Sequence, residues 1–234
     1  MSVTGGLSGD GAAFAQTVVI CNGPAESNVV AAVGFYGNRL EVGYASQGGW
    51  DPFGPERLIT RAEGNVLHEL DGRSALDLYK TYLGAHSAGL PATGLLFPLS
   101  LRMGDGQTGL VRTILAVNEA EGSMTFAGDM PVGAYARLMR ANFDRLIDGS
   151  TGAARESSRG VRGNPDLAIL ISCVGRKLVL KQRIEEEVEG VREVLGPSTV
   201  LTGFYSYGEI SPFTPGARCS LHNQTMTITT FRER

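Results

Sequence analysis

The stretch Asp166-Leu167-Ala168-Ile169-Leu170-Ile171-Ser172-Cys173-Val174 decides the fold of this chain, because it is short, nearly all apolar and bounded by turn residues. Such a run predicts a buried β-strand. Residues 176–195 predict the strongest helix of the chain, and residues 199–204 predict a further strand. A strand, a helix and a strand in this order predict a parallel strand pair joined by a right-handed crossover.

The helix expected at residues 176–195 is amphipathic, and Gly196-Pro197 ends it. Its acidic side, which we expect to be solvated, carries Glu185, Glu186 and Glu189. Its apolar side, which should face the sheet, carries Ile184, Val188, Val191 and Leu195.

The rest of the chain predicts mainly strands. Alternating or β-branched runs occupy residues 17–21, 39–44, 65–70, 111–118, 123–127, 132–139 and 223–231. Residues 35–40 are typical of a hairpin turn, and residues 95–101, which contain Pro98, of an edge strand or an extended loop. The expected fold class is therefore α/β in the mixed α+β sense, with mixed sheet layers packed against a few helices.

Two shorter helices are expected outside the parallel unit. Asp71 offers a cap for a helix whose apolar residues continue to Leu83 before Gly84. Residues 142–147 begin another helix, which should dissolve into the Gly- and Ser-rich residues 149–163, expected to be mobile or weakly helical.

The clearest break in the chain is at residues 48–55, which contain two prolines and three glycines. The only tryptophan, Trp50, and Phe53 lie inside this break. A solvated linker does not need these rings, so we expect the segment to pack on something or to line a cavity.

The composition disfavours several classes of partner. The chain has 234 residues, 42% hydrophobic content and a formal net charge of −3, without a block of Lys or Arg, which disfavours nucleic acid and anionic membranes. Its longest apolar run, residues 167–174, is far shorter than the roughly 20 residues that span a bilayer, and the N-terminus lacks a signal peptide. Three cysteines do not suit a secreted disulfide scaffold. We therefore expect a soluble, cytoplasmic protein.

A dense cluster of polar side chains lies in Gly203-Phe204-Tyr205-Ser206-Tyr207-Gly208-Glu209-Ile210 and Cys219-Ser220-Leu221-His222-Asn223-Gln224-Thr225. Side chains alternate along a strand, so Tyr205 and Tyr207 should share a face, with Glu209 continuing it if the strand persists. Such a face is either a clamp for a ligand amine or a polar network that satisfies itself. Both interpretations stay open at this point.

The corner after the buried strand carries Cys173 and Arg176. Free amides at a helix start together with Arg176 suit a carboxylate or phosphate, and the alternative is an Arg176 paired with an acidic neighbour. Cys173 would need a base such as His222 and an oxyanion site to act as a nucleophile, so a buried thiol is the favoured interpretation.

A metal site is not expected, because Cys219 and His222 form a C-x-x-H pair without a second pair at a usable spacing. We therefore assign no catalytic residue and no metal ligand. The candidate ligand-binding residues are Cys173, Arg176, Tyr205, Tyr207, Glu209, Cys219, His222 and Asn223.

Several segments together resemble the FIST family of prokaryotic sensory domains. They are Val66-Leu67-His68-Glu69-Leu70-Asp71-Gly72 leading into Ala75-Leu76-Asp77-Leu78-Tyr79, Val111-Arg112 with Phe126-Ala127-Gly128-Asp129, Ser172-Cys173-Val174-Gly175-Arg176, and the two C-terminal stretches quoted above. The resemblance implies a complete C-terminal FIST domain at residues 63–234. Residues 1–62, with Gly48-Gly49-Trp50-Asp51-Pro52, resemble the tail of an N-terminal FIST region.

The resemblance implies non-catalytic sensing of a small molecule, such as an amino acid or a similar polar compound, in prokaryotic intracellular signal transduction. Output would pass to a partner such as a histidine kinase, a cyclic-di-GMP enzyme or a chemoreceptor. Some related proteins are haem-containing nitric oxide sensors, so the alternative is a haem protein with His222 as axial ligand. Two further alternatives are a cysteine hydrolase based on Cys173 and an interaction scaffold without a ligand.

Overall fold

The computed structural model describes residues 2–11, 13, 15–104, 108–212 and 218–234, and these form two compact units of mixed α+β structure. Unit 1 comprises Met1–Gly49, Leu146–Leu221 and Thr225–Arg234, and unit 2 comprises Trp50–Arg145 and His222–Gln224.

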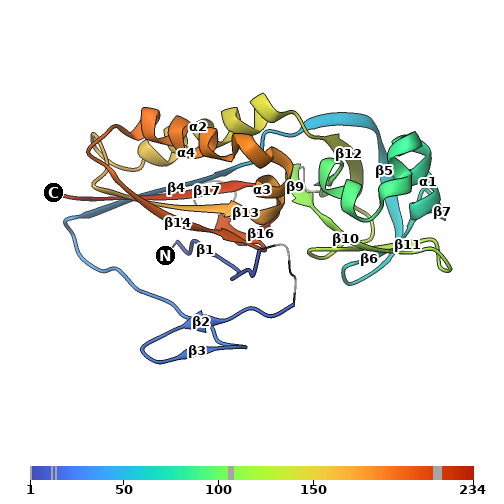
Figure 1. Cartoon of the computed structure of the whole chain (residues 1–234), viewed down its shortest axis with the longest axis horizontal. Coiled ribbons are helices and arrows are strands. Elements are labelled where there is room, and N and C mark those ends of the chain that lie inside the picture. Colours follow the sequence, from blue (N-terminus) through green and yellow to red (C-terminus); the bar gives the residue numbers. More distant parts are fainter. Residues whose placement is uncertain (1, 12, 14, 105–107, 213–217) are drawn as a thin grey trace. The chain divides into compact units, whose positions relative to one another are not determined.

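Most of unit 1 is a sheet with helices on one of its faces (Figure 1). Its elements are β1 (Gly5–Gly6), β2 (Val19–Ile20), β3 (Ala25–Glu26), β4 (Leu40–Gln47), α2 (Phe143–Ser158) from Leu146 onward, β13 (Leu167–Cys173), α3 (Val174–Leu180), η3 (Lys181–Arg183), α4 (Ile184–Leu195), β14 (Val200–Ser206), β15 (Glu209–Pro212), β16 (Cys219–His222) up to Leu221, and β17 (Met226–Glu233). The strand order is β14-β13-β17-β4.

The buried strand predicted at residues 166–174 is confirmed as β13, and the strand predicted at residues 199–204 as β14. The two pair in parallel, as expected, with Leu170 opposite Gly203. The alternating C-terminal run forms β17, which pairs antiparallel with β13 on one side and with β4 on the other. The predicted strand–helix–strand unit therefore forms one half of this sheet.

The core of unit 1 lies between the sheet and helices α2 and α4. Alternate sheet residues, Ala168 and Leu170 among them, pack against Ala153 of α2 and against Val191 and Leu195 of α4. This contact uses small side chains on α2, so the helix backbone approaches the strands closely.

Two helix predictions in unit 1 are wrong. The helix expected to dissolve after residue 148 continues as α2 to Ser158, because its Gly, Ser and Ala residues form a buried face of small side chains. The single helix expected at residues 176–195 is interrupted, because Lys181 adopts a positive φ of 52° between α3 and α4.

The buried face of α4 agrees with the predicted face at Val191 and Leu195 and differs from it at Val188 and Glu187. Glu187, Val191 and Leu195 are the buried residues of this helix, whereas Val188 is exposed. Glu187 can be buried because it forms an ion pair with Arg176, which is described below.

The hairpin predicted at residues 35–40 is wrong. Residues 29–36 form no strand, and β4 pairs with β17, which is almost two hundred residues away in the sequence. The Gly-rich start of the chain instead contributes β1, which pairs with β15 in a sheet of order β1-β15-β16.

Unit 2 is a second sheet with the strand order β10-β11-β6-β5-β12-β8-β9, to which β7 is added beside β6. Its elements are β5 (Asp51–Glu63), β6 (Val66–Leu70), β7 (Arg73–Ser74), α1 (Ala75–Leu83), η1 (Gly84–Gly89), η2 (Ala92–Leu96), β8 (Leu99–Arg102), β9 (Thr108–Arg112), β10 (Ile114–Asn118), β11 (Ser123–Phe126) and β12 (Tyr135–Arg140). Helix α1 and the sheet enclose a core that includes Leu76, Tyr79, Leu99 and Phe126.

The strands predicted at residues 65–70 and 123–127 are confirmed as β6 and β11, and α1 ends before Gly84 as expected. Its cap is Ser74, whose Oγ accepts from the amide of Asp77, whereas Asp71 lies in the turn before β7 and accepts from the amide of Leu58. The cap prediction was therefore wrong by one turn.

Three further predictions in unit 2 need correction. Of residues 48–55, expected to break regular structure, residues 48–50 do so, whereas residues 51–55 belong to β5. An irregular register opposite β12 and a positive φ at Gly54 accommodate Pro52 and Pro55 in this strand. Strand β8 lies between β12 and β9 and is not an edge strand. The single strand predicted at residues 111–118 is divided at Thr113 into β9 and β10.

The close approach of α2 to β4 gives a stability prediction. A Cβ atom at Gly43 would lie 1.8 Å from the carbonyl oxygen of Ser157, which also accepts a hydrogen bond from Thr230. We expect Gly43→Ala to lower the free energy of unfolding by at least about 1–3 kcal/mol, because backbone must move. Urea unfolding measures the change. Gly5→Ala is the control, because a Cβ there meets no atom within 4 Å; equal costs for the two variants would contradict the prediction.

Candidate functional site

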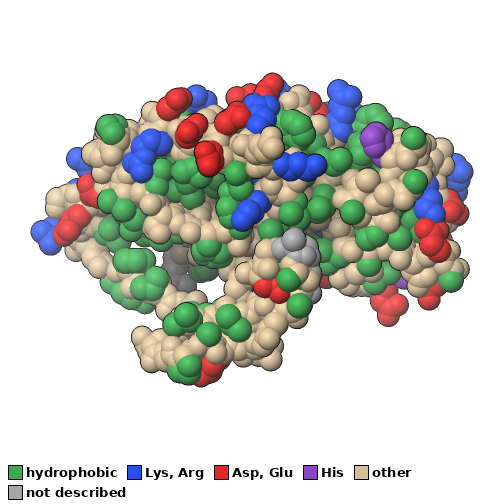
Figure 2. Space-filling model, in the orientation of Figure 1, with side chains coloured by type: hydrophobic (Ala, Val, Ile, Leu, Met, Phe, Trp, Pro, Cys, Tyr) green, Lys and Arg blue, Asp and Glu red, His purple; other side chains and the backbone are tan. Residues whose placement is uncertain are grey.

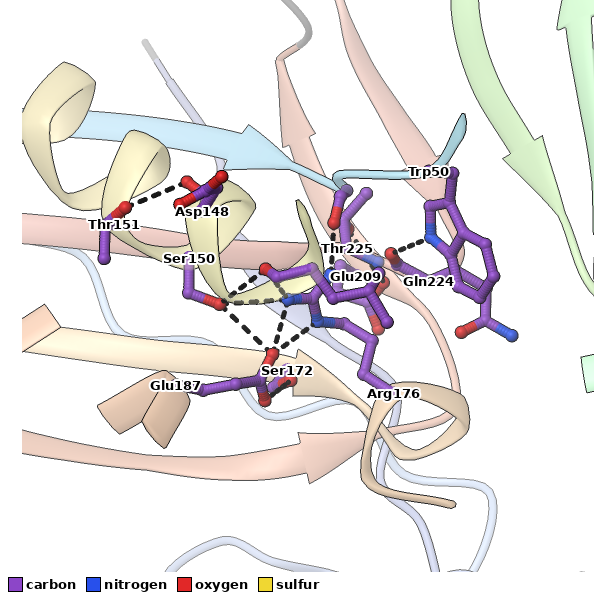
Figure 3. Close-up of polar contacts among 12 residues, drawn as sticks. Trp50, Asp148, Ser150, Thr151, Ser172, Arg176, Glu187, Glu209, Gln224 and Thr225 are labelled. Carbon is purple, nitrogen blue, oxygen red and sulfur yellow. Dashed lines mark hydrogen bonds and ion pairs between the residues drawn. The ribbon is translucent and has the colours of Figure 1, made fainter. Parts of the chain in front are cut away.

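A buried ion pair lies at the end of β13 in unit 1. Arg176 of α3 and Glu187 of α4 are both 0% exposed. The Nε atom of Arg176 donates to Oε1 of Glu187 at 2.7 Å, and its Nη2 atom lies 2.5 Å from the same oxygen. Two serines complete the carboxylate environment: Ser150 Oγ donates to Oε1 at 3.1 Å and Ser172 Oγ to Oε2 at 3.3 Å (Figure 3).

The guanidinium of Arg176 also binds backbone. Its Nη1 atom donates to the carbonyl of Gly48, and its Nη2 atom donates to the carbonyl of Leu146 at 2.7 Å. One side chain thus joins α3, α4, the start of α2 and the chain after β4. Arg176 was predicted to attract an anionic ligand, and in this structure its donors serve the protein itself.

Glu209 is a second buried acid in unit 1. Its Oε1 atom accepts from Ser206 Oγ at 2.5 Å, and its Oε2 atom accepts from the amide and the hydroxyl of Thr225 at 3.2 and 2.9 Å. Burial raises the pKa of Glu209 to about 7, whereas these hydrogen bonds and the charge of Arg176 act in the opposite direction. This carboxyl fixes the chain before β17 to β15.

Tyr205 and Tyr207, which were predicted to share one face of a strand, contact different neighbours. Strand β14 ends at Ser206, so the alternation that would place Tyr205 and Tyr207 on one face does not continue. The ammonium of Lys177 lies 4.9 Å from the Tyr205 ring centre, and burial raises the pKa of Tyr205 to about 12. Tyr207 instead donates to the Asp10 carboxylate and to the Gly11 carbonyl at 3.0 Å.

The two cysteines among the candidate residues, Cys173 and Cys219, each contact a backbone group of the protein. Cys173 is 4% exposed at the start of α3, and its amide donates to Thr225 O at 3.0 Å. Cys219 is exposed, its Sγ atom lies 3.4 Å from Val3 O, and desolvation raises its pKa. The raised pKa of Cys219 is the opposite of what a reactive thiolate requires.

The remaining candidates, His222 and Asn223, belong to unit 2 and are each 1% exposed. The side-chain Nδ2 atom of Asn223 donates to the backbone carbonyl of His222 at 3.0 Å. A haem iron needs an axial ligand that faces a space large enough for the macrocycle, and a histidine buried to this degree does not fit that requirement. In the described part of the chain, no group of three His, Cys, Asp or Glu residues is placed to hold a metal ion.

Trp50 packs as the sequence predicts. It is 8% exposed, and its indole nitrogen donates to the Gln224 carbonyl at 3.0 Å within unit 2 (Figure 3). Two segments quoted above for the family resemblance, Val111-Arg112 and Phe126-Ala127-Gly128-Asp129, contact each other in unit 2. The Arg112 Nε atom donates to the Asp129 carbonyl oxygen at 3.1 Å. A Cβ at Gly128 would lie 2.9 Å from that Nε atom, so the glycine leaves room for the guanidinium.

Unit 2 contains a pocket of about 410 Å³. It is lined by Phe53, Tyr82, Leu83, His86, Leu96, Phe97, Arg140, Ala141 and Phe143. Its walls are mainly aromatic, and its volume is in the range of small-molecule sites. The expectation that the segment around Phe53 lines a cavity is therefore confirmed.

Unit 1 contains a smaller pocket of about 300 Å³ along β4, which Glu156 of α2 and Arg159, just after α2, also line. Acidic and basic side chains are intermingled over the helices of this unit (Figure 2). A mixed surface of this kind has no single-sign field to attract a polyanion.

Sequence reasoning did not identify Glu187, the partner of Arg176 in the buried ion pair, or Arg140, which lines the pocket of unit 2. Glu187 could have been found, because its spacing of four and eight residues from Val191 and Leu195 places it on the buried row of α4. Arg140 carried no signal of its own, since the strand predicted at residues 132–139 only indicates that Arg140 lies near a strand end.

Fold and site together define a mixed α+β protein in which the ionisable motif residues are largely buried and hydrogen-bonded and in which one unit holds a pocket of ligand size. A model of the FIST N domain matches residues 1–73, and a model of the FIST C domain matches residues 75–212. The chain therefore belongs to the FIST family, whose members are small-ligand sensory domains of signalling proteins. No curated protein and no solved structure showed a significant match to the sequence. Helices able to cross a membrane are absent from the part of the chain that the structure describes.

Proposed function

We propose that this chain is a non-catalytic sensory module that binds a small polar molecule, such as an amino acid, in intracellular signal transduction. The ligand changes the stability or the surface of the module, and a partner protein reads that change. The membership of the FIST family supports this class of function.

The observation that carries the proposal is the burial of the groups that could perform chemistry. Cys173 is 4% exposed, His222 1% and Glu209 0%. A nucleophile, a base and an acid must each reach a substrate atom within hydrogen-bond distance. These groups instead support the positions of α3, β15 and the chain before β17, which favours a binding role over turnover.

A partner protein is expected because the chain carries apolar side chains on its surface. Val30 is 93% exposed and Tyr36 is 89% exposed, and both lie in the irregular chain before β4. Clustered exposed apolar residues mark interaction surfaces in soluble proteins. A histidine kinase, a cyclic-di-GMP enzyme or a chemoreceptor is the class of partner proposed for this surface.

A thermal-shift screen across amino acids, small carboxylates and hemin tests the sensing proposal. A compound that binds only the folded state raises the melting temperature, so we expect at least one compound to do so, and calorimetry should confirm its binding. Cys21→Ser is the control for binding and should keep it, because this exposed thiol lies outside the candidate ligand-binding residues. A screen without any stabilising compound, or turnover that is lost in Cys173→Ser, would contradict the proposal.

Two variants test the C-terminal cluster as the ligand site. Tyr207→Ala and His222→Ala should weaken binding of the compound found by the screen if the cluster holds the ligand. Calorimetry that shows native affinity in both variants, with folding verified by circular dichroism, would place the site elsewhere.

A further inference from the structure

The pocket of unit 2 has fixed aromatic walls. The rings of Phe53 on β5 and Phe97 after η2 lie 6.3 Å apart between centroids, and the His86 ring lies 5.3 Å from that of Phe97. The interplanar angles are 46° in both pairs, so the rings form inclined walls and do not stack on each other closely. At these distances the rings contact one another as aromatic pairs, so a flat apolar group would pack against the side of the pairs that lines the pocket.

Hydrogen bonds outside the pocket hold these walls in place. The Tyr79 hydroxyl donates to the carbonyl of Phe97 at 2.7 Å, and Tyr79 itself is buried. Arg57 donates to the Tyr82 hydroxyl at 2.6 Å. A site whose walls are positioned before the ligand arrives loses less conformational entropy on binding.

The polar lining of the pocket carries cationic or hydrogen-bonding nitrogen atoms. Arg140 is the last residue of β12, and the amide of the next residue, Ala141, donates to the Leu96 carbonyl at 2.9 Å, which fixes the backbone there. Among the described residues, the Arg140 guanidinium has no ion pair or hydrogen-bond partner within the protein. The pocket lining contains no carboxylate, because its polar side chains are those of Tyr82, His86 and Arg140.

We propose that this pocket binds a small monocarboxylate with an aromatic or other flat apolar body. The body would pack against the rings of Phe53, Phe97 and Phe143, which line the pocket. The carboxylate would pair with the guanidinium of Arg140, which presents two parallel donors to a carboxylate. The His86 imidazole is a second donor at the same opening. This assignment rests on the proposed sensing function and names the class of ligand and the place where it binds.

The composition of the pocket disfavours other ligand classes. A cationic ligand would meet Arg140 without a compensating acid in the lining. A strongly polar ligand such as a sugar would leave its hydroxyl groups unpaired against the aromatic walls, which costs free energy. An apolar ligand without a carboxylate would make no ion pair with the Arg140 guanidinium.

Calorimetry with two matched probes tests the assignment. Phenylacetate carries the ring and the carboxylate, and phenylacetamide is its neutral counterpart. The full chain should bind phenylacetate about tenfold more tightly than phenylacetamide, since one charge-assisted pair at an open site corresponds to about that factor. Arg140→Met should remove this preference by weakening only phenylacetate, and Arg140→Lys should restore part of it.

Two further variants separate the contributions. Phe143→Ala, at a partly exposed wall residue, should weaken both probes by a similar factor, because it removes apolar contact. Arg61→Met removes the same charge from unit 2 at an exposed surface pair with Glu69 and should leave both affinities unchanged.

The outcomes distinguish this assignment from the sensing proposal. Absence of phenylacetate binding, or an equal loss in Arg140→Met and Arg61→Met, would overturn the assignment of the pocket. If a compound from the screen then still binds and depends on Tyr207 or His222, sensing stands and the pocket is wrong. If neither phenylacetate nor any screened compound binds, both proposals are wrong.

Discussion

Replacing Arg176 by methionine should lower the free energy of unfolding by about 3–5 kcal/mol, because it leaves the Glu187 carboxylate buried without its partner. Both side chains are 0% exposed, so water cannot replace the lost interaction without a local opening. The carbonyls of Gly48 and Leu146 lose their donors in the same substitution. This is the largest single-residue effect that we expect in unit 1.

Urea unfolding of three variants tests this expectation. The double variant Arg176→Met with Glu187→Leu should recover most of the loss, because an apolar pair of similar volume can replace a buried ion pair. Arg183→Met is the control at the partly exposed pair with Glu186, where about 0.5 kcal/mol or less is expected. If Arg176→Met costs no more than Arg183→Met, the buried pair does not hold the helices as described.

Raising the pH should destabilise the chain through Glu209. Its pKa is about 7 in the folded state and about 4.5 in an unfolded chain, so the folded state holds the proton more tightly between these values. The contribution to stability is complete below pH 4.5 and is lost as the pH rises through about 7. A difference of this size corresponds to roughly 3 kcal/mol.

Glu209→Gln isolates this effect. A glutamine keeps an oxygen acceptor for Thr225 and places an amide beside Ser206 Oγ, whose oxygen can accept. We expect the variant to be more stable than the native chain at pH 8, by up to about 3 kcal/mol, and to have similar stability at pH 4. Urea unfolding across this pH range measures the difference between the two chains.

The control for charge removal is Glu185→Gln on the exposed side of α4, which should change stability at pH 8 by less than about 0.5 kcal/mol. A difference in stability between Glu209→Gln and the native chain that does not vary with pH would show that Glu209 has the same pKa in the folded and unfolded states, and would contradict the raised pKa.

The parallel pair of β13 and β14 was predictable from the sequence, and so were β6, β11, β17 and the end of α1 at Gly84. Each follows from a local pattern, because an apolar run, an alternating run or a terminal glycine reports the state of its own backbone. The FIST resemblance was also readable, since its motifs are contiguous stretches of residues.

Helix α2 shows where local patterns fail. Its Gly149 and neighbouring small residues weaken a helix in isolation, yet a Cβ at Gly149 would lie 2.6 Å from Gly48 O, so the packing requires a glycine there. The long-range contact offsets the low helix propensity. Pro52 and Pro55 likewise disfavour a strand locally, and pairing of β5 with β12 offsets this effect.

The sequence by itself determined the strand–helix–strand unit, the mixed α+β class and the family. Only the tertiary structure decided that Arg176 meets Glu187, that Tyr205 and Tyr207 face different neighbours, and that Phe53, Phe97 and Arg140 surround one pocket. The physical reason is that periodicity records which side of an element is apolar, whereas the partner of a polar or aromatic group depends on contacts between distant segments. Those contacts exist only once the sheets have formed.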